Sequence, residues 1–367
     1  LAVARGALTM DDRNALLAEV EEDVVRHVLY DNFLQAQILS QESVVSPNHM
    51  EAYEDLMVGF ETQDVLDREL EALPNAEDMA ERRRSTTGMT RPELAVLLAY
   101  AKQSLTNALL ASSLPDSAYL ERDLRAYFPP QVVERFGPML NEHPLRRELI
   151  AMLVANDVVN SQGITFVSRV VTETGAEAAD VTRAYRIARD VTGAVERWEE
   201  IEALVGSLEP ALLDELMAGV DRLVEITARW YLQHLPGQLG RAIEAHAGPF
   251  EAFAGSVAAL APDGWRQERE RAAWALMDRG VPEDVARAHV ALTFLVHGPN
   301  VAEVAEATGR SIEDVARAFF LVGESVYVDW LEARLSAVST TTRWHRWALQ
   351  ALEDDLRLLR RQVVEHV

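Results

Sequence analysis

The amino-acid sequence predicts an all-α protein, a multi-helix array of two or more packed helical subdomains with little or no β-sheet. Apolar residues recur at intervals of three and four along most of the chain, the spacing that places them on one face of a helix. Helix-capping residues precede several of these segments. No segment shows sustained alternation of apolar and polar residues between hairpin turns, so strands are not expected.

The segment after Met89 is the clearest predicted helix. Thr90 is a candidate N-cap, Pro92 is tolerated in the first turn, and Glu93 stands three residues after the cap, as in a capping box. One apolar stripe follows, at Leu94, Leu97, Leu98, Ala101, Leu105, Ala108 and Leu109. Similar reasoning predicts helices over residues 11–42, 49–73, 92–113, 116–126, 130–141, 144–161, 164–174, 177–204, 209–234, 238–260, 265–279, 282–297, 311–336 and 343–365.

The opening helix keeps its apolar positions from Leu16 to Ile38, which is about six turns. It is either packed on its own subdomain or a connecting helix whose upstream end leaves a preceding domain. The polar segment Asn75–Gly88 breaks the helical pattern and predicts a linker, and a less clear break lies near Leu235–Gly240. The expected organisation is a long connecting helix and helical segment at 1–74, a linker at 75–90, a helical subdomain at 91–235 and a C-terminal helical subdomain at 236–367.

The sequence also contains an internal repeat. Thr174-Gly175 precedes Asp180-Val181, Arg183-Ala184 and Tyr185, and the same spacing recurs in Thr308-Gly309, Asp314-Val315, Arg317-Ala318 and Phe319. The pattern predicts a short helix, a left-handed glycine at its end and an N-capped amphipathic helix. Such helix pairs can read DNA, but few basic residues stand on the second helices, which favours a packing motif.

The bulk composition excludes several classes of function. A formal charge of −24 argues against nucleic-acid and anionic-lipid partners, which need clustered Lys and Arg. The absence of cysteine excludes disulfides and thiolate metal sites. No run of about 18 uncharged apolar residues occurs, so no membrane-spanning helix is expected. The chain begins at Leu1 rather than Met, which suggests a fragment or a proteolytic product.

Catalytic motifs are missing from the sequence. No two of the 18 glycines are spaced G-x-G, and no phosphate loop, zinc-protease or nucleophile-elbow motif is present. The nine histidines form no cluster with metal-ligand spacing. Lys102 is the only lysine, and its position is typical of a side chain that covers apolar surface with its stem. We therefore assign no catalytic, cofactor-binding or metal-binding residue to this chain.

One polar cluster interrupts an apolar helix, in the sequence LVANDVVNSQG. Its residues are Asn156, Asp157 and Asn160, followed by Thr165. Buried amides are costly unless they are hydrogen-bonded, so the cluster predicts a structural network that bridges helices. The functional alternative is a polar surface that faces another domain or a small effector. Trp344 and Trp347 similarly fit either interhelical packing or an interface.

The ordered succession of several segments resembles the helical C-terminal region of the large bacterial NAD-dependent glutamate dehydrogenases. These segments include MTRPELAVLLAYAKQSL, LERDLRAYFPPQVVERF, HPLRRELIAMLVANDVVNSQGITFVSR and LMAGVDRLVEITARWYL. The resemblance covers most of residues 8–234 and is weaker beyond them. None of that family's substrate lysines, catalytic aspartate or nucleotide-loop residues map onto this chain, so they are expected upstream of it.

The resemblance implies a non-catalytic region of a larger enzyme that oxidises L-glutamate to 2-oxoglutarate and ammonium with NAD. It also implies a cytoplasmic homo-oligomer, in which this region braces or gates the catalytic domain of the same polypeptide. Two other hypotheses are an independent helical scaffold that binds a protein partner and a DNA-binding regulator. The sequence identifies neither an allosteric effector nor the surface that meets the catalytic domain.

Overall fold

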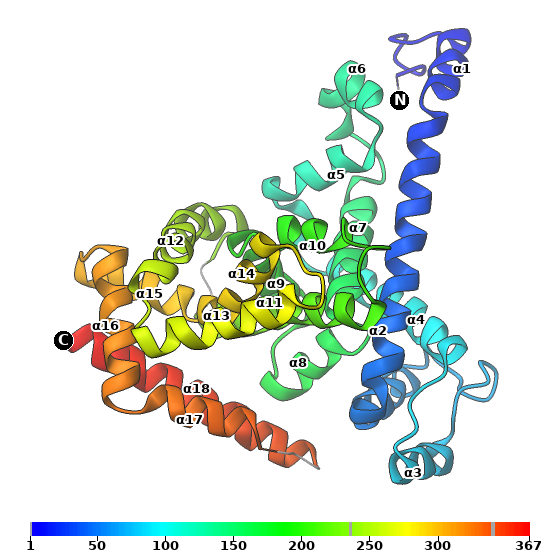
Figure 1. Cartoon of the computed structure of the whole chain (residues 1–367). Coiled ribbons are helices and arrows are strands. Elements are labelled where there is room, and N and C mark those ends of the chain that lie inside the picture. Colours follow the sequence, from blue (N-terminus) through cyan, green and yellow to red (C-terminus); the bar gives the residue numbers. More distant parts are fainter. Residues whose placement is uncertain (1, 235–236, 339–341) are drawn as a thin grey trace. The chain divides into compact units, whose positions relative to one another are not determined.

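Eighteen α-helices and two short 3-10 helices make up the protein over residues 2–234, 237–338 and 342–367, which the computed structural model describes (Figure 1). No strand occurs in these residues, and the one extended pairing is an isolated bridge between Val205 and Leu208. The predicted all-α class is confirmed. The chain divides into two compact units, Leu1–Arg183 and Ala184–Val367. The helix α9 (Ala178–Val191) runs across this division.

The first unit contains eight complete α-helices within the described residues. They are α1 (Met10–Glu19), α2 (Glu21–Thr62), α3 (Ala76–Ser85), α4 (Arg91–Leu110), α5 (Glu121–Tyr127), α6 (Pro130–Leu140), α7 (Arg146–Gln162) and α8 (Phe166–Thr174), with 3-10 turns η1 (Leu114–Asp116) and η2 (Ala118–Leu120). The closest packing joins α4 to α7, and α2 packs against both. The expected apolar stripe of α4 is buried, with Leu94 and Leu97 completely covered. Glu93 accepts the Thr90 backbone N–H at 2.7 Å, which fixes the start of this helix.

The longest helix, α2, has two halves with different surroundings. From Ile38 to Phe60 it presents a buried face to α3, α4, α7 and α8. Its backbone leaves the helical region at His49 (φ −123°, ψ 17°), two residues after Pro47. A proline removes one backbone hydrogen bond and crowds the preceding turn, which accounts for the bend. The sequence suggested two helices separated at residues 43–48; the structure instead joins them through this bend and ends the helix at Thr62.

The second unit is built from the remaining helices. They are α10 (Ala194–Glu202), α11 (Pro210–His234), α12 (Leu239–Leu260), α13 (Asp263–Met277), α14 (Glu283–Leu295), α15 (Gly298–Thr308), α16 (Ile312–Ser325), α17 (Val328–Ser336) and α18 (Arg343–His366). The helix α12 packs against α14, α15 and α16, and α18 packs against α15, α16 and α17.

Three long predicted helices are divided in the structure, and the first of them, 11–42, breaks at Val20 between α1 and α2. The segment 177–204 breaks after Val191, where Gly193 has a φ of 61°, and 311–336 breaks at Tyr327, with a φ of 59°. Residues 76–85, inside the expected linker, form α3, which Asn75 caps by accepting the Glu77 and Asp78 N–H groups. The subdomain boundaries near residues 75–90 and 235 stay a prediction, and residues 235–236 lie outside the described part of the chain.

The internal repeat has the predicted local structure. The helices α8 and α15 both end at a threonine followed by a left-handed glycine, Gly175 (φ 71°) and Gly309 (φ 69°). Each threonine hydroxyl donates to the carbonyl four residues earlier, at 2.7 Å from Thr174 and 2.6 Å from Thr308. Ser311 then caps α16 by accepting the Asp314 N–H. The helix–glycine–helix pattern is therefore a recurrent way of turning the chain.

Within the described residues, no single helix has both the length and the apolar composition needed to cross a membrane. The bent pair formed by α7 and α8 meets these two criteria only when its helices are taken together.

Candidate functional site

The predicted polar cluster lies at the carboxyl end of α7. Asn156, Asp157 and Asn160 are half-buried on one side of this helix, and Thr165 is buried at the start of α8. The Ser161 hydroxyl donates to the Asp157 carbonyl at 2.6 Å. The Oδ1 atom of Asn160 is buried and has no hydrogen-bond partner among the described residues. The structure thus brings three of the four residues together on α7, and the helix-bridging network stays a prediction.

A buried acid beside this cluster was missed by the sequence analysis. Glu42, on α2, is only 5% exposed, and its Oε1 atom accepts the Ile164 backbone N–H at 2.7 Å in the turn between α7 and α8. Its Oε2 atom accepts a hydrogen bond from the Tyr53 hydroxyl. Burial raises the pKa of Glu42 to about 7, against the opposing effects of the Ile164 hydrogen bond and the positive charge of Arg169.

A signal for this acid was present in the sequence. Glu42 stands four residues after Ile38 and four before Ser46, and Met50 follows at the same interval; all four are buried. The acid therefore occupies a position on the core-facing side of the helix. Charged residues at such positions are rarely fully buried without partners. The position of Glu42 on the buried side of the helix therefore indicates a structural or functional group.

The turn that Glu42 holds requires a glycine. Gly163 ends α7 with a φ of 92°, and a Cβ atom built there would lie 2.3 Å from the Glu42 Oε1 atom. Backbone and carboxylate can approach this closely because glycine has no side chain. The axes of α7 and α8 differ by 89° across the turn. The buried carboxylate thus fixes a sharp corner between two helices against a third.

A second buried side chain of α2 acts similarly one turn further along. The Ser46 hydroxyl accepts the Met89 backbone N–H at 3.0 Å, just before α4. Both contacts satisfy a backbone N–H that has no helical partner, because each lies between helices. The helix α2 therefore organises the first unit by receiving backbone donors from two separate turns.

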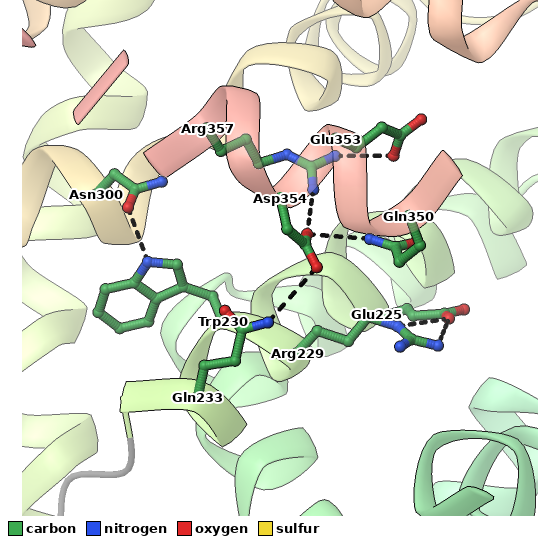
Figure 2. Close-up of polar contacts among 9 residues, drawn as sticks. All are labelled: Glu225, Arg229, Trp230, Gln233, Asn300, Gln350, Glu353, Asp354 and Arg357. Carbon is green, nitrogen blue, oxygen red and sulfur yellow. Dashed lines mark hydrogen bonds and ion pairs between the residues drawn. The ribbon is translucent and has the colours of Figure 1, made fainter. Parts of the chain in front are cut away.

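In the second unit, a polar network joins α11, α15 and α18 (Figure 2). The Trp230 indole donates to the Asn300 Oδ1 atom at 2.8 Å, which links α11 to α15. Asp354, on α18, accepts hydrogen bonds at 2.9 Å from Arg357 and at 3.1 Å from Gln350. Gln233 of α11 approaches the other oxygen of Asp354 at 3.5 Å. These donors and acceptors are matched within the protein, an arrangement typical of interhelical packing.

The carboxyl-terminal helix is also held by a buried arginine. Arg360 donates to the Phe319 carbonyl from Nε at 3.1 Å and from Nη2 at 2.7 Å, and Nη1 reaches the Asp329 carboxylate at 2.7 Å. Burial, together with the charges of Arg360 and Arg357, lowers the pKa of His297 well below its ordinary value. This imidazole is therefore neutral at pH 7 and contributes no charge to the cluster.

The remaining residues singled out by the sequence are not among the polar groups described above. No group of three or more His, Asp and Glu residues in the described part of the chain is arranged to hold a metal ion. Lys102 is half-buried on α4, and burial lowers its pKa to about 8 against the opposing charge of Asp31. Trp344 and Trp347 pack edge to face at 4.9 Å, with Trp344 63% exposed.

Comparison with known proteins identifies the family. A family model described as glutamate dehydrogenase, C-terminal, matches residues 86–367. The chain belongs to the glutamate dehydrogenase C-terminal family. It is 36% identical over 360 residues to an NAD-specific glutamate dehydrogenase of Pseudomonas aeruginosa and 33% identical over 361 residues to one of Halomonas elongata. A protein of the same name from Mycobacterium tuberculosis is 29% identical over 361 residues.

Each of these matches covers 96% of the chain but only 22% of the relative. The chain therefore corresponds to about a fifth of the length of the glutamate dehydrogenases that it resembles. The boundaries of the two comparisons also differ: the C-terminal family model begins at residue 86, whereas the full-length relatives match nearly the whole chain. In this glutamate dehydrogenase region, α1, α2 and α3 thus precede the C-terminal family segment.

Proposed function

We propose that this chain is the non-catalytic C-terminal helical region of a large NAD-dependent glutamate dehydrogenase, which it braces or regulates. The observation that carries the proposal is the match of 96% of the chain to 22% of enzymes named NAD-specific glutamate dehydrogenase. In the complete polypeptide, the reaction would convert L-glutamate, NAD and water to 2-oxoglutarate, ammonium and NADH. The partner of this region would be the catalytic domain of the same polypeptide, in a cytoplasmic homo-oligomer.

The residue types in this chain support the proposal that it is a non-catalytic region of the enzyme. A dinucleotide site of the common type needs a strand, a glycine-rich turn and a helix whose amino terminus meets the pyrophosphate. The described residues contain no strand, and no G-x-G spacing occurs in the sequence, so they do not fit NAD in this manner. Arg is a poor general base, and Lys102 is the single lysine of the chain. NAD and the substrate would therefore bind elsewhere in the polypeptide.

The experiment compares glutamate-dependent NAD reduction by the full-length polypeptide and by a version that stops just before Leu1. We expect the full-length protein to be active and the soluble truncated protein to be impaired. Measuring kcat, KM and the aggregation state of both separates a loss of turnover from a loss of solubility. Equal kinetics and equal solubility would contradict a bracing or regulatory function. An inactive full-length protein would contradict the assignment to glutamate oxidation.

A further inference from the structure

The amino-terminal half of α2 exposes an apolar face. Between Glu21 and Phe33, every side chain except that of Asp23 is exposed, although the segment contains several valines and aromatic residues. We define the outer face of α2 as five side chains whose exposed fractions lie between 38% and 62%: Val24, Val25, Val28, Leu29 and Phe33. On a helix of about 3.6 residues per turn they spread over roughly half of the circumference, with Val25, Val28 and Leu29 toward its centre.

One acid of the same helical segment contacts the rest of the unit. Gln131 of α6 donates to the Asp23 carboxylate at 3.0 Å. Asp31, which is exposed, acts electrostatically on Lys102 of α4. A helix that packs only on its own unit normally turns its apolar stripe inward and its acids outward. Here the apolar side chains of the outer face are exposed instead, interspersed with exposed Glu21, Glu22 and Asn32.

The length of the related proteins indicates what this partner is. The chain covers 22% of the relatives, and the C-terminal family model starts only at residue 86. The helix α2, at residues 21–62, thus belongs to the stretch that joins the C-terminal family segment to the remaining part of such a polypeptide. The outer face begins at Val24, 62 positions before the start of the family segment at residue 86. A covalently attached partner is held at a high local concentration, which favours this contact over one between separate molecules.

We propose that the outer face of α2 is the docking surface for the preceding, catalytic part of the same polypeptide. This inference rests on the proposed function, since it takes the chain to be the C-terminal region of a longer enzyme. Three of its five side chains are valines, and the face lies on a regular helix, so the matching surface is expected to be an apolar groove or helix face. Asp23 is excluded from the contact, because its carboxylate already accepts a hydrogen bond from Gln131 of the first unit.

The test places a photo-crosslinking amino acid, p-benzoylphenylalanine, at Leu29 in the full-length polypeptide. Leu29 is 62% exposed, so the larger side chain fits without disturbing the core. Leu70, which is 81% exposed in the same unit but outside the outer face, receives the same amino acid as a matched control. After irradiation, peptide mass spectrometry identifies the attached segment. A mixture of isotopically light and heavy chains shows whether it comes from the same molecule.

We expect Leu29, and not Leu70, to attach to a segment upstream of Leu1 in the same molecule. Attachment to a second copy would overturn the proposal, and so would an absence of cross-linking at Leu29 beyond the level at Leu70. The paired substitution of Val25→Gln and Leu29→Gln should weaken the contact, measured as lost cross-linking from a probe at Val28. Because cross-linking requires no turnover, its failure is distinguishable from a failure to oxidise glutamate.

Discussion

At the scale of single residues, Glu42 determines how the first unit responds to pH. Its pKa rises from 4.5 to about 7 because burial disfavours its charged form. The folded protein therefore holds this proton more tightly than the unfolded chain does. The resulting stabilisation is complete below about pH 4.5 and is lost as the pH rises through about 7. The corner between α7 and α8 is accordingly most stable under mildly acidic conditions.

Replacing Glu42 with glutamine should remove this pH dependence. Glutamine keeps an oxygen acceptor for the Ile164 N–H but cannot ionise. The shift in pKa corresponds to roughly 3 kcal/mol of unfolding free energy, so the Glu42→Gln protein should gain stability relative to wild type as the pH rises from 5 to 8. Urea unfolding at both pH values measures the difference. Glu81→Gln, at an exposed site on α3, is the control; a Glu42→Gln profile parallel to wild type would refute the explanation.

Replacing Gly163 with alanine should destabilise the same corner. The residue has a φ of 92°, and the added Cβ atom would press against the buried Glu42 carboxylate. Backbone strain alone costs about 1–3 kcal/mol, and the clash adds to it. Gly175→Ala is a matched control, since Gly175 also has a positive φ of 71° but open space around the Cβ position. Thermal unfolding should show a larger loss for Gly163→Ala, and equal losses would contradict a specific contact with Glu42.

At the scale of elements, the sequence predicted the helices well wherever periodicity and capping agreed. In α4, the stripe from Leu94 to Leu109 and the cap at Thr90 act on the same segment, and the structure confirms both. The predicted helix ranges omit residues 298–308, although the internal repeat predicts a short helix before Gly309, and these residues form α15. Pro299 is accommodated in the first turn of α15, and a Cβ atom at Gly298 would lie 2.5 Å from Phe250.

The division at Tyr327 and the contact between Glu42 and Ile164 could not be predicted from the local sequence. Tyr327 adopts a φ of 59°, which the local sequence gives no reason to expect from an aromatic residue. Ile164 lies 122 positions after Glu42, so no local pattern pairs them. The polar cluster around Asn156 was predictable because its amides interrupt an apolar stripe. The hydrogen bond between Glu42 and the nearby Ile164 N–H was not predictable.

The attachment of α18 can be tested through Arg360. Substitution by alanine leaves the Asp329 carboxylate and the Phe319 carbonyl without their buried donor, which should cost about 3–5 kcal/mol. Arg361→Ala is the control on the same helix, because its ion pair with Glu303 is more exposed and should contribute about 1 kcal/mol or less. Hydrogen exchange of α18 amides measures the loosening. Equal exchange in both variants would contradict the proposed attachment.

At the scale of the whole molecule, the excess of acidic residues limits the partners that the chain can bind. The chain has 59 acidic and 35 basic residues, which gives the formal charge of −24. Phosphate backbones are repelled by such a charge unless basic residues are clustered. The repeated helix–glycine–helix pattern therefore turns the chain and is not expected to read DNA.

The charge argument predicts that the protein passes through a DNA-agarose column without retention, even at low salt. Binding through phosphate contacts weakens steeply as salt increases, so a salt gradient is the decisive measurement. Elution in the flow-through is expected for the wild-type chain. Retention that is released progressively by salt would show a local basic surface and would overturn the prediction.

The position of the outer face of α2 also bears on how the polypeptide is made. Ribosomes complete the amino-terminal part of a chain first, and domains generally fold in that order. The partner that we propose for Val25, Val28 and Leu29 would thus already be folded when α2 leaves the ribosome. The apolar stripe would be covered soon after its synthesis and would spend little time available to chaperones or to other nascent chains. If this region were synthesised without the rest of the polypeptide, its outer face would stay exposed and would be available to chaperones.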